Sequence, residues 1–328
     1  MVIDMEEDYI LARKAARKVA SKICSLDNDY FEFFTVAIYV ILRIYDDDYK
    51  DFIIGLVEEC DIYFDYGSVE EIMKKNGLYE NFDFDTDPSS AIAVSIPDTF
   101  LHFDETCFDF DHSNKPTIVC SKDCENLTVI LNTFIHEFQH LLTSYFKPVE
   151  IKYEDDEQIA SLRSGLSITR YVYDGEDIKD YHYFRIINEA ITVVRTTEAM
   201  KEILSLKEFC PDDDVLSFVD ELDRYYIEHD FAYEEIIPIF RTLWKNEQFK
   251  QLVERNIVSG DIQEIVDEFN EDLGVGEFQR MAQLLDDISY TSQFNKKMEL
   301  RRLKDELRKI IKAYNTKNNV LQKRTRQN

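Results

Sequence analysis

Residues 125–146 read ENLTVILNTFIHEFQHLLTSYF, and they form a strongly apolar helical pattern around which the rest of the chain can be interpreted. Its apolar residues recur at helical spacing, so the pattern predicts one long helix that ends before Pro148. They also lie on nearly every side of that helix, which is typical of a helix buried in the protein core. The apolar positions are Leu127, Ile130, Leu131, Phe134, Ile135, Phe138, Leu141 and Leu142.

The chain before this helix changes character once. Helical periodicity runs through the first 60 residues and resumes up to Met73, which predicts a helical segment. Beyond Pro88 the apolar runs become short and are separated by Pro and Asp, a pattern that favours strands of a small sheet. The predicted strands are Ala91–Ile96, Phe100–Phe103 and Thr117–Cys120.

The chain after the central helix reads as a loop, a strand and then helices. An acidic loop covers Glu154–Glu157, a strand covers Leu166–Tyr173, and a long helix is expected over Ile178–Leu206. Everything beyond Pro211 is expected to be helical. The sequence therefore predicts an α+β protein: a helical segment (1–86), a core with the sheet (87–210) and a second helical segment (211–328).

Composition limits the partners and the compartment. The 66 acidic residues outnumber the 38 basic ones, and a body with a net charge of −28 repels nucleic acid and anionic lipid. The longest apolar run, Phe33–Leu42, is too short for a membrane span, and Met1–Tyr9 does not resemble a secretory leader. We therefore expect a cytoplasmic protein whose 6 cysteines are reduced thiols.

The C-terminal tail has the opposite charge. From Lys296 to the end there are 12 Lys or Arg and 3 Asp or Glu. The stripe Leu300, Leu303, Leu307, Ile310, Ile311 and Tyr314 has the spacing of one helix face. We expect this basic helix to dock on the acidic body, and a protein partner or an anionic surface is the alternative.

A motif in the central helix predicts a metal site. His136 and His140 are four residues apart, so they share one helix face and both imidazoles can point at one ion. Glu137 lies about 100° around the helix, where it can reach a metal-bound water and act as general base. This pattern predicts one Zn²⁺ per chain and hydrolysis of an amide bond. The alternative is a structural, hydrogen-bonded pair of histidines.

A second motif supports a family resemblance. Residues 187–192 read INEAIT and look like the glutamate-helix motif of thermolysin-type metallopeptidases. Together the two motifs resemble the gluzincin branch of the zincins, which includes thermolysin-like and hyicolysin-like peptidases. The resemblance implies a zincin-like core, a small mixed sheet with an active-site helix and a glutamate helix. It also implies that His136, His140 and Glu189 bind zinc while Glu137 is the base.

The resemblance has one departure and leaves some choices open. Val193 stands where thermolysin-like enzymes carry an Asp that orients the first histidine, so support for that histidine must come from elsewhere. Without the second motif, four acidic residues rival Glu189 as third ligand: Glu150, Glu154, Asp155 and Glu157. The expected donors to the oxyanion of the attacked carbonyl are His229, Tyr183 and His182.

The sequence thus predicts a zinc-dependent peptidase that acts on a peptide or protein. Such a substrate would add as a strand to a sheet edge, and Thr117–Val119 is either that edge or an ordinary inner strand. One rival is a catalytically inactive zincin-like binding protein in which zinc is structural. Another is an interaction protein whose helices act and whose histidines bind no metal.

Overall fold

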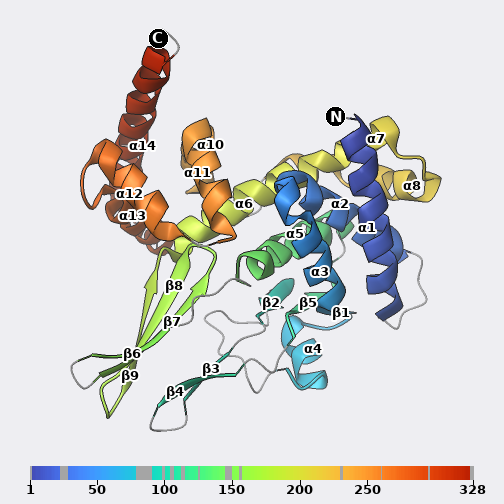
Figure 1. Ribbon diagram of the computed structural model, residues 1–328, viewed down its shortest axis with the longest axis horizontal. Coiled ribbons are helices and arrows are strands. Elements are labelled where there is room, and N and C mark those ends of the chain that lie inside the picture. The colour runs from blue at the N-terminus through green and yellow to red at the C-terminus, as the bar shows by residue number, and fades with distance from the viewer. Residues whose placement is uncertain are drawn as a thin grey trace. The chain divides into compact units, whose positions relative to one another are not determined.

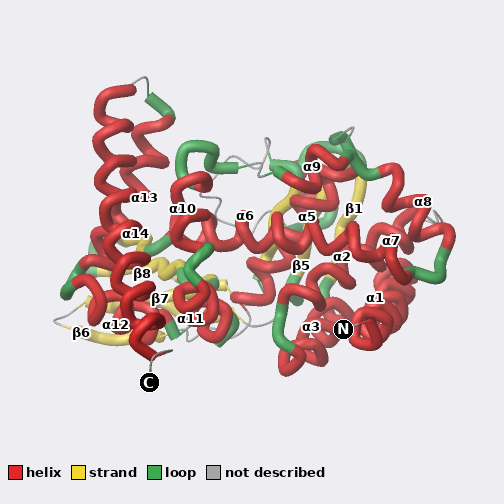
Figure 2. Tube along the Cα trace, turned by 90° about the horizontal axis from the view of Figure 1, so that it is seen from above, coloured by secondary structure: helices red, strands yellow, loops and turns green. Residues whose placement is uncertain are grey.

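A computed structural model of the chain confirms the α+β class: the residues that it describes form many helices and three small sheets (Figures 1 and 2). The chain forms two compact units. Unit 1 comprises Met1–His102, Asp109–Leu142 and Arg195–His229, and unit 2 comprises Phe103–Phe108, Thr143–Val194 and Asp230–Asn328. The structure describes residues 2–22, 29–78, 91–97, 100–103, 107–111, 115–124, 126–144, 150–154, 157–229, 232–259, 261–294 and 296–325.

The helices of unit 1 surround an aromatic core. Phe33 and Phe34 of the apolar α2 are buried, and both rings contact Phe64 and Phe134. This packing explains why the apolar run at 33–42 is a core helix. The elements are α1 (Val2–Lys22), α2 (Asp29–Ile44), η1 (Asp47–Tyr49), α3 (Lys50–Glu59), α4 (Val69–Lys75), η2 (Ile203–Ser205), α7 (Leu206–Phe209), α8 (Asp213–Glu221) and α9 (Arg224–Glu228), together with α5 (Leu127–Ser144) and α6 (Arg185–Glu202), which the division between the units cuts.

A three-stranded sheet of unit 1 has the order β1-β5-β2. Its strands are β1 (Asp61–Asp65), β2 (Ala93–Ile96) and β5 (Thr117–Ser121), and β1 is parallel to β5 whereas β2 is antiparallel. The prediction of a wholly helical segment 1–86 is wrong at β1, because residues 61–65 do not continue α3 but pair with β5. Residues 117–119 belong to the buried central strand, so the inner-strand alternative is correct and β2 is an edge strand.

Unit 2 contains an antiparallel sheet with the order β6-β7-β8-β9. The strands are β6 (Glu150–Glu154), β7 (Glu157–Ser164), β8 (Ser167–Tyr173) and β9 (Ile178–Tyr183). The strand predicted over 166–173 is confirmed as β8, but the helix predicted from Ile178 is wrong over its first six residues. These pair with β8 after a turn in which Asp174 accepts hydrogen bonds from the backbone of Glu176 and Asp177, so helix α6 begins at Arg185.

Two further strands form a separate small sheet. Strands β3 (Phe100–Phe103) and β4 (Phe108–Asp111) form a two-stranded sheet, and β4 was not predicted. Of the predicted acidic loop, Glu154 ends β6 and Glu157 begins β7, while residues 155 and 156 lie outside the described residues. Pro148 also lies outside them.

The C-terminal helices of unit 2 pack on one another. Tyr314 of α14 is fully buried, stacks on Phe269 at 4.5 Å between ring centroids, and contacts Phe249. Leu303, Leu307, Ile310 and Ile311 of the predicted stripe are also buried, and Figure 2 shows α13 beside α14. No helix in the described part of the chain is both long and apolar enough to cross a bilayer. The helices are α10 (Ile237–Trp244), α11 (Glu247–Ile257), α12 (Ile262–Leu273), α13 (Glu277–Ser292) and α14 (Lys297–Thr325).

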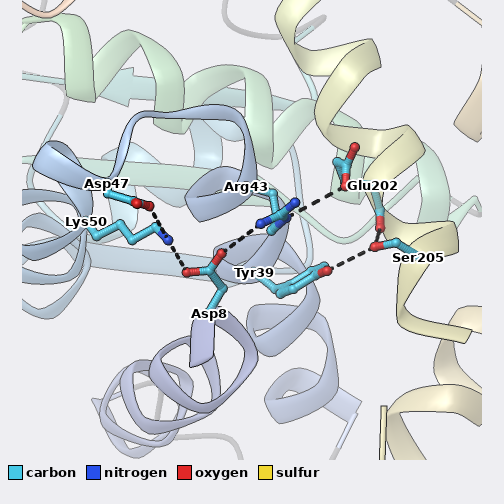
Figure 3. Close-up of polar contacts among 7 residues, drawn as sticks. All are labelled: Asp8, Tyr39, Arg43, Asp47, Lys50, Glu202 and Ser205. Atoms are coloured by element: carbon cyan, nitrogen blue, oxygen red, sulfur yellow. Dashed lines mark hydrogen bonds and ion pairs between the residues drawn. The ribbon is translucent and has the colours of Figure 1, made fainter. Parts of the chain in front are cut away.

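A buried ionic network joins four elements of unit 1 (Figure 3). Asp8 of α1 is fully buried and pairs with Arg43 of α2 at 3.3 Å and with Lys50 of α3 at 2.5 Å. Burial alone would lower the pKa of Lys50, but its hydrogen bonds to Asp47 and Asp8 raise it. Arg43 also approaches Glu202 at the end of α6, at 3.9 Å. The network therefore holds the C-terminal end of α6 against α1 and α2.

Candidate metal centre

Helix α5 carries the histidine motif as the sequence predicts. The side chain of Asn126 accepts hydrogen bonds from the backbone of Thr128 and Val129, so an Asn caps the first turn. The apolar positions of the predicted set are buried except Leu127, which is half-buried. His136, Glu137 and His140 are half-buried, which leaves their polar groups on the part of the helix that the core does not cover.

The two imidazoles converge on one point. The Nε2 atoms of His136 and His140 are 3.0 Å apart, and their rings meet at 76° with centroids 4.7 Å apart. Either one ring donates a hydrogen bond to the other, or both lone pairs face one cation. Bonds of 2.0–2.1 Å from a tetrahedral zinc would separate two nitrogens by about 3.3 Å. The observed pair therefore fits a shared metal with little adjustment.

The intervening carboxylate is held by the sheet. Oε2 of Glu137 accepts a hydrogen bond from the backbone N–H of Ser95 at 3.0 Å and another from its hydroxyl at 2.9 Å. Ser95 lies on β2, so this N–H leaves the edge of β2 on the side away from β5. The edge strand of unit 1 and the histidine helix are thus in direct contact, and the orientation of Glu137 is determined by that contact.

Glu189 lies on α6, half-buried between the buried residues Asn188 and Ala190. Within unit 2, the turn between β7 and β8 joins this part of α6 to the last turn of α5. Oδ1 of Asn188 accepts a hydrogen bond from the backbone N–H of Leu166 at 2.9 Å, and the N–H of Gly165 donates to the carbonyl of Thr143 at 3.1 Å. The same turn is therefore bound by Asn188, which precedes Glu189, and by Thr143, which lies three residues after His140.

A second contact within unit 1 joins the same two helices. The side-chain amide of Gln139 on α5 donates to the hydroxyl of Thr196 on α6 at 2.7 Å, and both side chains are buried. Thr196 follows Glu189 by seven residues, which is about two helical turns, so both lie on the same face of α6. That face is the one directed toward α5.

The start of α6 is supported by α13. The carboxylate of Asp286 accepts a hydrogen bond from the backbone N–H of Ile186, one of the N–H groups that a first helical turn leaves without an intrahelical partner. Burial raises the pKa of Asp286, although this hydrogen bond and the charge of Arg185 act in the opposite direction. Glu189 therefore stands one turn inside a capped helix.

The structure brings the three predicted ligands together. His136, His140 and Glu189 each offer one ligand atom, and these atoms lie within 4.8 Å of one another. Two imidazole nitrogens and one carboxylate oxygen form the donor set of many catalytic zinc sites, so the chemistry of the side chains fits zinc. Of the rival ligands, Glu150 pairs with Lys152 at 2.7 Å and Glu157 is exposed. Asp155 and the side chain of Glu154 lie outside the described residues.

The predicted oxyanion donors lie in other settings. His229 in unit 1 stacks on Tyr225 with ring centroids 4.2 Å apart, and its Nδ1 is 2.8 Å from the carbonyl oxygen of that residue. In unit 2, His182 on β9 lies 3.0 Å from the carboxylate of Asp180, and Tyr183 is exposed. Their proposed role in the reaction stays a prediction. Val193, the departure from the family pattern, is buried and apolar.

Sequence reasoning missed the residues that support the site. Ser95 precedes Glu137 by 42 positions, and neither residue type at that spacing signals a contact. Asn188 lies within the quoted INEAIT stretch, but its role depends on the turn that it binds. Gly165 could have been found, because a glycine between two strands often marks a tight turn with positive φ.

We expect Gly165→Ala to damage both the fold and the metal site. Gly165 has φ of +59°, and a Cβ placed there would lie 2.3 Å from Oδ1 of Asn188. The backbone strain alone costs about 1–2 kcal/mol, and the clash displaces the residue beside Glu189. Urea unfolding should show a loss of about 2 kcal/mol or more.

Gly55→Ala is the matched control. Gly55 lies inside α3, and nothing is within 4 Å of its added Cβ. This substitution should stabilise the protein by about 0.5–1 kcal/mol, because Ala is the better helix former. A Gly165→Ala protein as stable as the natural chain would contradict the role assigned to this turn.

Comparison with known proteins gives no match: no family model, no curated protein and no solved structure is similar to this chain.

Proposed function

We propose that this chain is a zinc-dependent peptidase. The observation that carries the proposal is the convergence of His136, His140 and Glu189 beside a carboxylate that is held in place, that of Glu137. A bound zinc would lower the pKa of its water ligand to about 7 and polarise a substrate carbonyl. The three ligands would come from α5 and α6 of one chain, one ion per chain.

Glu137 has the geometry of a general base. Both hydrogen bonds from Ser95 end on Oε2, so Oε1 is available to take a proton from an attacking water and return it to the leaving amine. Glu137 follows His136 on α5 but lies on a different face of the helix. This position is better suited to proton transfer with a metal-bound water than to direct binding of the metal. The role of Ser95 in this reaction is to hold the carboxylate in one orientation.

The edge strand β2 suits an extended peptide as substrate. The backbone N–H of Ser95 points away from the sheet, next to the histidine helix. The N–H of Ser95 already binds Glu137, so an extended chain that pairs with the other outward backbone groups of β2 would run past Glu137 and would be held by main-chain hydrogen bonds. Binding of this kind is tolerant of side chains, so a peptide or an unfolded segment is the expected substrate class.

Metal analysis of protein purified without a histidine tag tests the ligand set. The natural chain should contain close to one zinc, and Glu189→Ala should weaken zinc binding by more than about a hundredfold, because a ligand contributes more than the outer groups that orient it. Glu198→Ala, on the same helix, is the control and should retain zinc. A zinc content that Glu189→Ala leaves unchanged would exclude the third ligand.

The second candidate function is that of a catalytically inactive binding protein in which zinc is structural. The absence of an Asp at Val193 favours it, because a missing partner for a metal-bound imidazole can reduce activity by about tenfold to a hundredfold. A zinc-loaded natural chain that cleaves nothing in a broad peptide library would identify this second function. A chain that holds no zinc and ignores added zinc would exclude both.

A further inference from the structure

A cavity lies wholly within unit 1, and none of the three metal ligands lines it. Its volume is about 610 Å³, and it opens where the parallel strands β1 and β5 end. Its walls include Tyr30, Phe64, Tyr66, Phe218 and the side chain of Lys122. The carboxyl ends of parallel strands are frequent sites for ligands, since the loops that follow them surround a hollow.

Three aromatic rings of this cavity already surround an ammonium group. Nζ of Lys122 lies 4.3 Å from the ring centroid of Tyr30, 5.3 Å from that of Phe64 and 5.4 Å from that of Tyr66. Ring faces attract cations because of their negative quadrupole, and cages of such rings bind organic ammonium groups. The aromatic cage, defined here as Tyr30, Phe64 and Tyr66, therefore has the chemistry of a cation site with Lys122 as its present occupant.

Hydrogen bonds hold the cage open in one geometry. The N–H of Lys122 donates to the carbonyl of Asp65 at 2.9 Å, which continues the parallel pairing of β1 and β5 by one residue. The hydroxyl of Ser121 donates to the carbonyl of Gly67 at 2.7 Å, and the N–H of Gly67 donates to Asp123 at 3.1 Å. Tyr30 meets Phe64 edge to face at 5.0 Å. A ligand would thus find the walls already in place.

Charge at the cavity also favours a cation. The carboxylates of Glu32, Asp212, Asp214 and Glu221 line it, against the cations Arg13 and Lys122. Arg13 is paired with Asp212 at 2.6 Å and lies over the ring of Phe31. The chain as a whole carries −28, so its field concentrates cations near the opening. Tyr66 is 72% exposed, which leaves an aromatic ring at the rim where a ligand can reach it.

We propose that this cavity binds an organic ammonium group, which replaces the ammonium of Lys122 in the aromatic cage. The shared chemistry is a compact cation on a slender chain, from a free small molecule or from a lysine side chain of a peptide. Lys122 is a resident competitor, so its side chain lowers the apparent affinity by keeping the cage occupied. The proposal is independent of the metal centre.

The test is a titration of the full chain, followed by NMR, with choline and with its neutral isostere 3,3-dimethylbutan-1-ol. Choline should bind and the alcohol should not, because the alcohol has the shape of choline but lacks its positive charge. A blocked Gly-Lys-Gly tripeptide forms the second arm. Tighter binding of the tripeptide than of choline would identify a peptide as the source, and the reverse would identify a small molecule.

Two variants give effects of opposite sign. Lys122→Gln empties the cage and should raise the affinity for choline at least about threefold. Tyr66→Ala removes one ring from the rim and should weaken binding about twofold to fivefold. Tyr290→Ala, which removes a Tyr of similar exposure from α13, should change nothing.

The Lys122 variant also separates this proposal from an anion site. If Lys122 served to bind an anion, Lys122→Gln would not favour choline, and inorganic phosphate would bind the natural chain instead. Failure of choline and of the tripeptide to bind the natural chain would overturn the proposal, as would binding confined to the Lys122→Gln protein. Equal binding of choline and its neutral isostere would overturn it as well.

Discussion

Glu137→Gln should reduce peptide hydrolysis by about 10²- to 10⁴-fold while the protein keeps its zinc. The amide has the shape of the carboxylate and can still accept the hydrogen bonds of Ser95, but it cannot take a proton from water. The substitution thus removes one chemical step and leaves the three ligands in place. The measurement is the rate of cleavage of a substrate found in a peptide library, together with the zinc content of the same sample.

Ser95→Ala is the companion variant. It keeps the carboxylate and the backbone N–H bond of 3.0 Å but removes the hydroxyl bond of 2.9 Å, so activity should fall far less than in Glu137→Gln. Cleavage that survives in Glu137→Gln at the natural rate would mean that another site or a contaminant is responsible. Loss of zinc in Glu137→Gln would indicate that Glu137 is a metal ligand and not the general base.

Asp8→Asn should lower the free energy of unfolding by about 3–5 kcal/mol. Asp8 is fully buried and faces the cations Arg43 and Lys50, as Figure 3 shows. A neutral amide leaves these two positive charges close together with less compensation, and removal of one partner from a buried ionic group is among the costly substitutions. Urea unfolding followed by circular dichroism measures the change.

Asp47→Asn is the control for this network. Asp47 also pairs with Lys50, at 2.6 Å, but its side chain is 90% exposed. An exposed ion pair contributes little to stability, so this variant should have a free energy of unfolding close to that of the natural chain. Equal losses of unfolding free energy in Asp8→Asn and Asp47→Asn would show that burial does not determine how much this network stabilises the protein.

The spacing of apolar residues was sufficient to predict two of the helices, α5, which is apolar on nearly every side, and α14, which has one apolar stripe. The central helix was predicted because its apolar residues repeat every three to four positions and bury themselves, and α5 covers Leu127–Ser144. The spacing of His136 and His140 follows from the same period, so their shared face needed no tertiary information. The stripe of α14 was predicted on the same basis.

Two of the missed strands, β9 and β1, lack such a pattern. Every residue of β9 is exposed, so no alternation between buried and exposed positions marks Ile178–Tyr183 as a strand. Its conformation is decided by hydrogen bonds to β8, which the residues of β9 alone do not encode. Strand β1 is similar: its residues do not alternate between buried and exposed positions, and pairing with Thr117–Ser121, more than 50 positions away, determines its conformation.

Local patterns in the sequence predict the α+β class and the helix that carries His136, Glu137 and His140, because both depend on residues that are close together in the chain. Glu189 as a candidate third ligand follows from the resemblance of residues 187–192 to the glutamate-helix motif. Tertiary structure alone decided the rest. His140 and Glu189 are 49 positions apart, and the chain folds back between them at a turn that binds Thr143 and Asn188. Ser95 contacts Glu137 of α5 from strand β2. Contacts between such distant residues arise from the packing of whole elements, which no local spacing records.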